Sequence, residues 1–344
     1  MYIIDVKTWT TNVKQLNNSH NKTNGTKKRI IDHLCKIYTM HGINELSDII
    51  VFRGRHVNPE LMDIIGKSKL IKPSNLNFQV QIGPYDFNSS SSGKAYFNFA
   101  ASHIGGGILS PEAGYVQEEK ITLQSSILLS MIGCNNYLPL ENTNLYDIPL
   151  VMKNVIIMAH ENYPVEFYGR FGLEKFKNNE ELIAKNYVLH KSHPSIIWVC
   201  KAIQPMKNSD TYKTKIHNGI PICRWALLMA IETNLTTIKI MEDDPTIKTI
   251  YINGGNWGCG AFGHNLNTIY AIEHMAMIIA VNIIKPIKNV IFTYHTYDNQ
   301  TFDKLNPSIN FVTQFIHQNL EVDIVMGVIN SFHSENNKIW CEKL

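Results

Sequence analysis

Short apolar segments alternate with longer segments of helical periodicity along most of this 344-residue chain. The short segments are rich in β-branched and aromatic residues, and they are too apolar to leave one face in water. This alternation predicts an α/β fold, in which a mixed but mainly parallel sheet is flanked by helices on both faces as a three-layer sandwich.

The expected elements follow from these patterns. The predicted strands are Asp48–Phe52, Phe78–Ile82, Ala95–Ala100, Val155–Ala159, Ile196–Val199, Thr249–Asn253, Val290–Tyr294 and Asp323–Val328. The predicted helices are Lys28–Met40, Glu118–Ile132, Ile222–Leu235, Asn265–Asn282 and Pro307–Asn319. Between Phe78–Ile82 and Ala95–Ala100 the chain has Gly83-Pro84 and a run of serines, which predicts a local antiparallel pair.

The chain has no internal repeat and no Pro/Gly-rich linker that would separate two domains. Residues 1–45 combine a short β-like start, a polar Asn/Thr-rich segment and a helix, and they are expected to form an N-terminal extension. Residues 46–344 are expected to form one domain. We expect a monomer.

Composition limits the classes of function. Hydrophobic residues make up 44% of the chain and charged residues 18%, as in ordinary globular proteins. A net charge of +3 is too small to indicate direct binding to DNA. The six cysteines form no CxxC pair, and the N-terminus lacks the apolar segment of a signal peptide. The prediction is an intracellular chain, in the cytoplasm or nucleus (of a host cell if the source is a virus or pathogen), without a membrane span.

The first segment that carries chemistry joins a glycine run to a pair of carboxylates. After the predicted strand Ala95–Ala100 come Gly105, Gly106 and Gly107, followed by Gln117, Glu118 and Glu119 at the start of a helix. Three glycines expose backbone N–H groups to a charged ligand. Because adjacent helical residues do not share a face, the two carboxylates should differ in role and exposure. Alone, each part would be a turn or a favourable first-turn charge; together they favour a site.

The second segment is a glycine loop between a predicted strand and a long predicted helix, an arrangement that binds phosphate through loop N–H groups. Its residues are Asn256, Trp257, Gly258, Cys259, Gly260, Ala261, Phe262 and Gly263. The aromatic residues can form pocket walls while the glycines bind an anion. Cys259 is expected to fill space in the loop. The loop is neither a dinucleotide fingerprint nor a Walker loop.

Together, the GGG…QEE pattern and GNWGCGAFG resemble the catalytic macrodomain of the poly(ADP-ribose) glycohydrolase family. The segment Glu161–Gly169 is similar to the tyrosine-rich clasp of that family, with one inserted residue. The likeness runs from about Asp48 to about Tyr297 and implies a macrodomain-like fold. It also implies hydrolysis of the O-glycosidic bond of ADP-ribose units, most directly in poly(ADP-ribose) chains, with no cofactor and no metal.

The resemblance assigns roles by position. Glu119 matches the acid that protonates the leaving ribose oxygen, and Glu118 matches the carboxylate that positions the ribose hydroxyls. Gln117 matches a residue that supports this loop. The glycine run from Gly105 to Gly107 and the loop Gly258–Gly263 would bind the diphosphate. The aromatic residues are assigned to adenine stacking, by Phe167 or alternatively Tyr168, and to packing against the distal ribose, by Tyr294.

Several departures from the family pattern affect the expected substrate. Ala101 stands where the family has an asparagine that contacts the ribose, Pro111-Glu112 lengthens the loop before the helix, and His264-Asn265 replaces Gly-Asp. Two alternatives stay open: a hydrolase that removes single ADP-ribose groups from protein side chains, and a non-catalytic ADP-ribose-binding module. The expected partner is poly(ADP-ribose) or an ADP-ribosylated protein. His190 and His193 form an HxxH pair without a convincing second ligand pair, so no metal site is predicted.

Overall fold

The protein is described by a computed structural model. It describes residues 4–9, 25–41, 49–54, 65–85, 94–100, 104–105, 108, 117–125, 128–129, 149–156, 159–160, 176, 179–189, 195–206, 210, 214–217, 219–260, 262–296 and 298–331.

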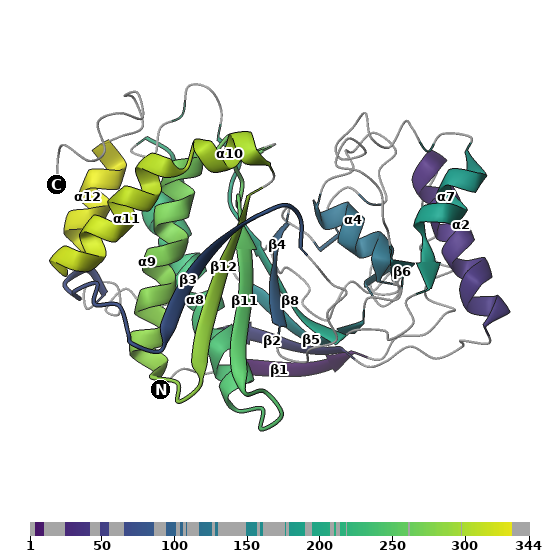
Figure 1. Ribbon diagram of the computed structural model, residues 1–344, viewed down its shortest axis with the longest axis horizontal. Coiled ribbons are helices and arrows are strands. Elements are labelled where there is room, and N and C mark those ends of the chain that lie inside the picture. The colour runs from purple at the N-terminus through teal and green to yellow at the C-terminus, as the bar shows by residue number, and fades with distance from the viewer. Residues whose placement is uncertain are drawn as a thin grey trace.

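One mixed sheet runs through the centre of the molecule (Figure 1). Its strands are β1 (Ile4–Trp9), β2 (Ile49–Gly54), β5 (Leu150–Ile156), β8 (Ser195–Ala202), β4 (Lys94–Ala100), β11 (Thr249–Gly255), β12 (Asn289–Thr296) and β3 (Leu76–Ile82), in this spatial order. The last five are parallel to one another, while β1, β2 and β5 pair antiparallel with their neighbours. The mainly parallel mixed sheet is therefore confirmed.

Helices cover both faces of this sheet. Figure 1 shows α8 (Ile222–Glu242), α9 (Leu266–Ile284), α11 (Asn306–Gln318) and α12 (Val322–Ser331) on one side, and α2 (Gly25–Met40), α4 (Gln117–Gln124) and α7 (Glu180–Asn186) on the other. The short elements are β6 (Ala159–His160), β7 (Val188–Leu189), β9 (Ile216–His217), β10 (Ile220–Pro221) and α10 (Asn299–Asp303). This is the predicted three-layer α/β architecture.

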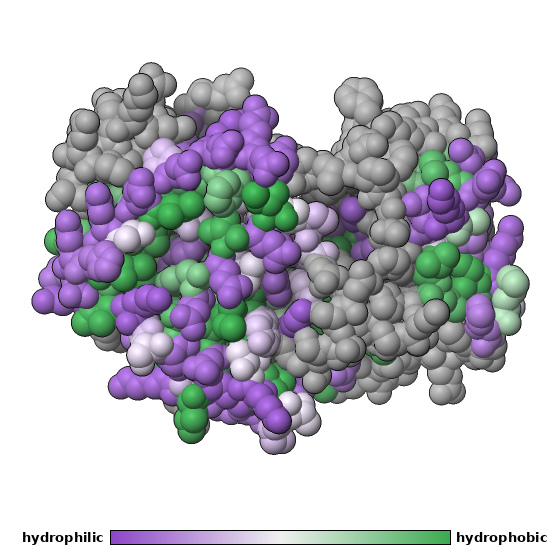
Figure 2. Space-filling model, in the orientation of Figure 1, coloured by the Kyte–Doolittle hydropathy of each residue, from purple (hydrophilic) through white to green (hydrophobic). Residues whose placement is uncertain are grey.

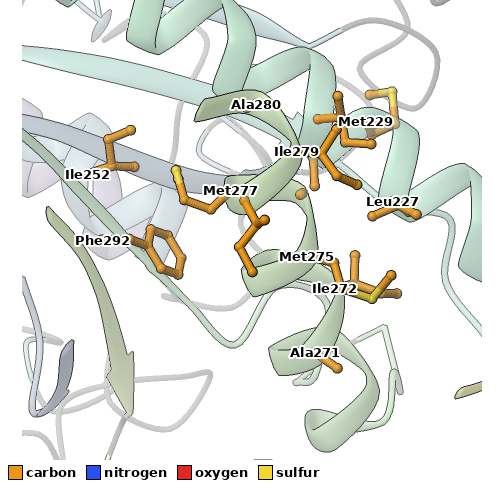
Figure 3. Packing of buried hydrophobic residues seen from close by; sticks show 14 of the residues in the cluster. Leu227, Met229, Ile252, Ala271, Ile272, Met275, Met277, Ile279, Ala280 and Phe292 are labelled. Atoms are coloured by element: carbon orange, nitrogen blue, oxygen red, sulfur yellow. The ribbon is translucent and has the colours of Figure 1, made fainter. Parts of the chain in front are cut away.

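Each face of the sheet has its own hydrophobic core, which explains why the strands are apolar on both sides. Along β8, Ile197 and Val199 belong to the core under α8 and α9, whereas Trp198 and Cys200 belong to the core under α2, α4 and α7. Figure 3 shows Met277 of α9 beside Ile252 and Phe292 of the sheet. Hydrophilic residues cover most of the visible surface over α10 and α11 (Figure 2).

Helix α9 is buried along most of its length. Among the described residues it is the one helix that is long and apolar enough to cross a membrane, judged by length and composition alone. However, 83% of its most apolar 18-residue segment is buried inside the protein. Residues 267–281 are all buried between the sheet and its neighbouring helices. The helix that follows the glycine loop is therefore a core helix here.

Two predictions about secondary structure are wrong. The predicted strand Asp323–Val328 is part of α12, because Val322, Val325 and Met326 are buried at helical rather than alternating spacing. The predicted antiparallel pairing of Phe78–Ile82 with Ala95–Ala100 is also wrong. Strand β11 and strand β12 lie between these two segments, and all four strands are parallel.

Several boundaries also differ from those predicted; helix α8, for example, runs to Glu242 instead of ending at Leu235. Strand β5 begins at Leu150 and ends at Ile156, and its register shifts between Met152 and Val155, where Asn154 has φ 66°. Helix α4 ends at Gln124 rather than at Ile132, although Leu128 and Leu129 are again helical. Strand β1 of the predicted N-terminal extension pairs with β2 as an edge of the sheet; the boundary at residue 46 stays a prediction.

His274 of α9 gives the fold a pH-dependent stability. Its ring lies 4.0 Å from the ring of Tyr270 and 4.6 Å from that of Phe78, between centroids, and burial lowers its pKa from 6.5 to about 4. The unfolded chain therefore binds a proton below pH 6.5 that the folded protein does not bind until about pH 4. The neutral buried ring therefore contributes roughly 3 kcal/mol to the free energy of unfolding above pH 6.5. This contribution is lost progressively as the pH falls from 6.5 to about 4.

We expect His274→Phe, which suits the same aromatic cluster, to lose less stability on acidification than the wild type, by roughly 2–3 kcal/mol between pH 7 and pH 4.5. The measurement is urea unfolding at both pH values. Equal losses in the two proteins would show that this histidine does not control the acid sensitivity.

Candidate active site

Both segments singled out in the sequence follow strands that end at the same edge of the sheet. The first follows β4 and the second follows β11, and these parallel strands are neighbours. The last residues of β4 and β8, Ala100 and Ala202, are paired. Ligands of open α/β sheets bind at the carboxyl ends of the strands. The fold therefore brings the two segments to the edge where a ligand is expected.

Glu118 is a buried carboxylate with two fixed hydrogen bonds. Its Oε1 atom accepts from the backbone N of Gly105 at 2.8 Å and from Nδ2 of Asn98 at 3.1 Å. Asn98 lies on β4 and is itself buried. The glycine run, the strand and the helix are thus tied together through one oxygen of Glu118, and the carboxylate has a defined position.

Gly105 contributes to the site through this hydrogen bond. Its N–H donates to Glu118, and the predicted contact of Gly105 with the diphosphate stays a prediction. Gly106 and Gly107, also predicted to bind the diphosphate, lie outside the described residues, as do Phe167, Tyr168 and Ala261.

Glu119 occupies the first turn of α4 beside Glu118. The expected difference in exposure is wrong, because the two side chains are 3% and 5% exposed. Their surroundings do differ. Glu119 attracts the ammonium of Lys27, a buried residue of α2; burial lowers the pKa of Lys27, and the Glu119 carboxylate opposes that shift. The N-terminal helix thus brings a positive charge to the candidate acid, a contribution that no sequence motif indicated.

Gln117 begins α4, and its Nε2 lies 3.5 Å from the backbone oxygen of Phe97 on β4. The same oxygen accepts from the hydroxyl of Tyr85 at 3.0 Å. Gln117 therefore links the start of the helix to the strand beside it; the supporting role that the resemblance implies stays a prediction.

The glycine loop after β11 is closed by its own backbone hydrogen bonds. Trp257 N donates to Gly255 O at 2.8 Å, Cys259 N to Asn256 O at 3.1 Å, and His264 N to Gly258 O at 3.0 Å. Gly258 has φ +71°, and a Cβ there would lie 2.6 Å from Cγ2 of Ile203. Only glycine suits this position.

Several N–H groups of this loop donate to no acceptor within the described part of the chain, among them those of Gly258 and Gly260. A Cβ added at Gly260 would have no atom within 4 Å. The loop leads into α9, whose first turn is capped by Asn265. Unpaired loop donors before a helix N-terminus are an arrangement that can bind an anion; diphosphate binding by this loop stays a prediction.

The aromatic residues of the loop are more buried than a pocket wall requires. Trp257 has no exposed surface and belongs to the core under α8 and α9, and Phe262 packs against the same core. Tyr294 of β12 is also fully buried, with its ring 4.8 Å from that of Tyr270. Burial raises the pKa of the Cys259 thiol, which favours a space-filling role over a reactive one. Ligand contacts by these residues stay predictions.

Several residues of the site region were not identified from the sequence. Asn98 interrupts an otherwise apolar strand, and that interruption was the available signal. Lys201 likewise lies in the apolar strand β8, fully buried. His295 of β12 places Nε2 3.0 Å from Oδ1 of Asn253, and burial lowers its pKa to about 4. Within the described residues, no group of three or more His, Cys, Asp or Glu side chains could hold a metal ion; His190 and His193 lie outside them.

No known family model and no curated protein matches this sequence. Similar solved structures include poly(ADP-ribose) glycohydrolase from Thermomonospora curvata bound to the inhibitor ADP-HPD, with TM-score 0.39 and 14% identity, covering 71% of this chain and 79% of that one. Another is poly(ADP-ribose) glycohydrolase from Deinococcus radiodurans in complex with ADP-ribose, with TM-score 0.43 and 14% identity, covering 74% and 94%. These are proteins of the family that the two motifs resemble; at this distance the likeness does not identify the substrate or the catalytic residues of this chain.

Proposed function

We propose that this protein hydrolyses the O-glycosidic bond of ADP-ribose units, in poly(ADP-ribose) chains with release of ADP-ribose, and that Glu119 is the general acid. The observation that carries the proposal is the meeting of two features at one edge of the sheet. One is a pair of buried carboxylates at the start of α4, and the other is a glycine loop with unpaired N–H groups after β11. The sequence resemblance assigns the same two segments to this reaction.

The chemistry needs what these segments supply. Cleavage of a ribosyl C1–O bond builds positive charge on the sugar ring, and the departing oxygen must receive a proton. In the proposal the Glu119 carboxyl donates that proton and later accepts one from the attacking water. Glu118, fixed by Gly105 and Asn98, orients the ribose hydroxyls. The glycine loop binds the diphosphate, whose negative charge stabilises the developing cation.

A second candidate is removal of single ADP-ribose groups from protein side chains. It is favoured by Ala101, which stands where the family has an asparagine that contacts the ribose, and by the insertion Pro111-Glu112. Either change would alter the contacts with the group attached to the distal ribose. A non-catalytic ADP-ribose-binding module is the third candidate, and the pair Glu118-Glu119 speaks against it because binding alone needs no buried acid pair.

Two labelled substrates separate these candidates. The protein is incubated with radiolabelled poly(ADP-ribose) and, separately, with a protein carrying single labelled ADP-ribose groups, and released ADP-ribose is measured by chromatography. The proposal expects release from the polymer. Release only from the mono-modified protein would replace it with the second candidate, and binding without release from either substrate would replace it with the third.

Asn98 tests the role of Glu118 in this proposal. Asn98→Ala removes one of two hydrogen bonds to the carboxylate, and a hydrogen bond to a charged group contributes about 1.5–3 kcal/mol. We expect kcat/KM for polymer hydrolysis to fall by about 10–100-fold. The control is Asn282→Ala, which removes an exposed asparagine bonded to the backbone of Ile71 far from this edge. Equal activity of the two variants would mean that the position of Glu118 does not matter for the reaction.

A further inference from the structure

A fully buried ion pair lies beneath the glycine loop. The ammonium of Lys201 on β8 forms a hydrogen-bonded ion pair with Oε1 of Glu273 on α9, and neither side chain has any exposed surface. The same ammonium lies between two aromatic rings, 4.3 Å from the ring centroid of Phe97 and 4.2 Å from that of Trp257. Both distances are well inside the range of cation–π attraction.

Stability alone does not account for this pair. Burial lowers the pKa of Lys201 and raises that of Glu273, and in each case the partner charge opposes the shift. The loss of hydration of two charges offsets much of their attraction, so that apolar residues of similar size often give an equally stable core. We therefore look for the role of this ion pair in the residues that it contacts.

The ammonium of Lys201 contacts Trp257, the first large residue of the glycine loop. The indole N–H of Trp257 donates to no acceptor within the described part of the chain, so no hydrogen bond fixes the ring. Its position depends on packing and on the ammonium against its face. The backbone N of Trp257 donates a hydrogen bond to Gly255 O, and the next residue, Gly258, accepts one from the backbone N of His264. A Cβ at Gly258 would lie 2.6 Å from Cγ2 of Ile203, so this part of the loop has little room to shift. A shift of the indole would therefore move the N–H groups that follow it.

We propose that Lys201 and Glu273 are positioning residues of the glycine loop, holding Trp257 so that the N–H groups of Gly258 and Gly260 face a diphosphate. This inference rests on the proposed function only in naming the diphosphate. The ordering of the loop by the ion pair does not depend on the ligand, and it is measured without one.

The central variant is the double substitution Lys201→Met with Glu273→Leu, which removes both charges and keeps apolar volume. Amide hydrogen exchange is measured on the unliganded protein, and the Kd for ADP-ribose is measured by calorimetry. We expect exchange of the hydrogen-bonded loop amides of Trp257, Cys259 and Gly263 to become at least about tenfold faster while exchange in α8 is unchanged, because only the loop loses its support. The Kd is expected to rise at least about tenfold, since the donors no longer hold a binding geometry.

The control removes a different ion pair. Lys153 and Asp244 pair elsewhere, with side chains 31% and 15% exposed, and the variant Lys153→Met with Asp244→Asn is expected to leave loop exchange and Kd unchanged. If the central variant shows wild-type loop exchange and a Kd within about twofold of wild type, the pair only fills space and the inference is overturned.

A milder variant covers the case in which the central one fails to fold. Glu273→Gln keeps an acceptor for the ammonium but removes its countercharge, and we expect loop exchange about threefold faster than in the wild type. Unchanged exchange in this variant would overturn the inference. A wild type whose loop is ordered but which binds no ADP-ribose would refute the proposed function and leave the positioning role in place.

Discussion

Glu119→Gln is expected to bind ADP-ribose with a Kd within about threefold of the wild type and to hydrolyse poly(ADP-ribose) at least about 100-fold more slowly. A general acid contributes about 10²–10⁴-fold, and a carboxamide of the same size cannot donate the proton. The measurements are calorimetry with ADP-ribose and the initial rate of ADP-ribose release from labelled polymer.

The choice of glutamine follows from the buried surroundings of this residue. Glu119 is 5% exposed and attracts the buried ammonium of Lys27, so Glu119→Ala would open a cavity as well as remove a charge. Glutamine keeps the volume and an acceptor oxygen. The matched control is Glu181→Gln, an exposed first-turn glutamate of α7, which should keep the wild-type rate. Near-wild-type hydrolysis by Glu119→Gln would remove this residue from the mechanism.

The second large effect is expected from Gly258→Ala, which should weaken ADP-ribose binding at least about 30-fold. An alanine at φ +71° costs about 1–2 kcal/mol, and its Cβ would lie 2.6 Å from Cγ2 of Ile203 and 2.8 Å from Cδ2 of His264. The loop must move to relieve these contacts, and its N–H groups would move with it. The Kd is measured by calorimetry and the free energy of unfolding by urea titration.

Gly219 provides the control for backbone strain. It has φ +77° in the turn between β9 and β10, and a Cβ there would meet no atom within 4 Å. Gly219→Ala should therefore lose about 1 kcal/mol of stability and keep the wild-type Kd. If both glycine variants bind ADP-ribose as the wild type does, the loop is not the diphosphate site.

The sequence predicted the layers of this fold because each strand carries its own signal. Strands such as β8 are apolar on both faces, which only a sheet covered on both sides explains. The strand that pairs with β3 could not be predicted from such local signals. Gly83-Pro84 indicates a turn, but which strand lies beside β3 depends on β12, more than 200 residues further along the chain. The short C-terminal helix α12 was missed because its apolar residues also suit a strand.

The parts of the candidate site that depend on local sequence could be proposed from the sequence alone. The glycine loop and the pair Glu118-Glu119 are contiguous segments, and the structure places them at one edge of the sheet. The contacts that fix them come from distant residues. Asn98 on β4 donates a hydrogen bond to Glu118, and the charge of Lys27 on the N-terminal helix attracts that of Glu119. Lys201 meets Trp257 only because β8 and β11 lie on either side of β4. None of these pairings has a spacing in the sequence that could indicate it.

The central claim is that one site binds the diphosphate at the glycine loop and presents Glu119 to the distal ribose. A crystal structure of Glu119→Gln with ADP-ribose tests it most directly. The account predicts phosphate oxygens about 2.7–3.2 Å from the N–H groups of Gly258 and Gly260, and the side chain at position 119 within hydrogen-bonding reach of the oxygen on C1 of the distal ribose. A nucleotide bound with its diphosphate away from this loop, or with that oxygen beyond about 6 Å from position 119, would contradict it.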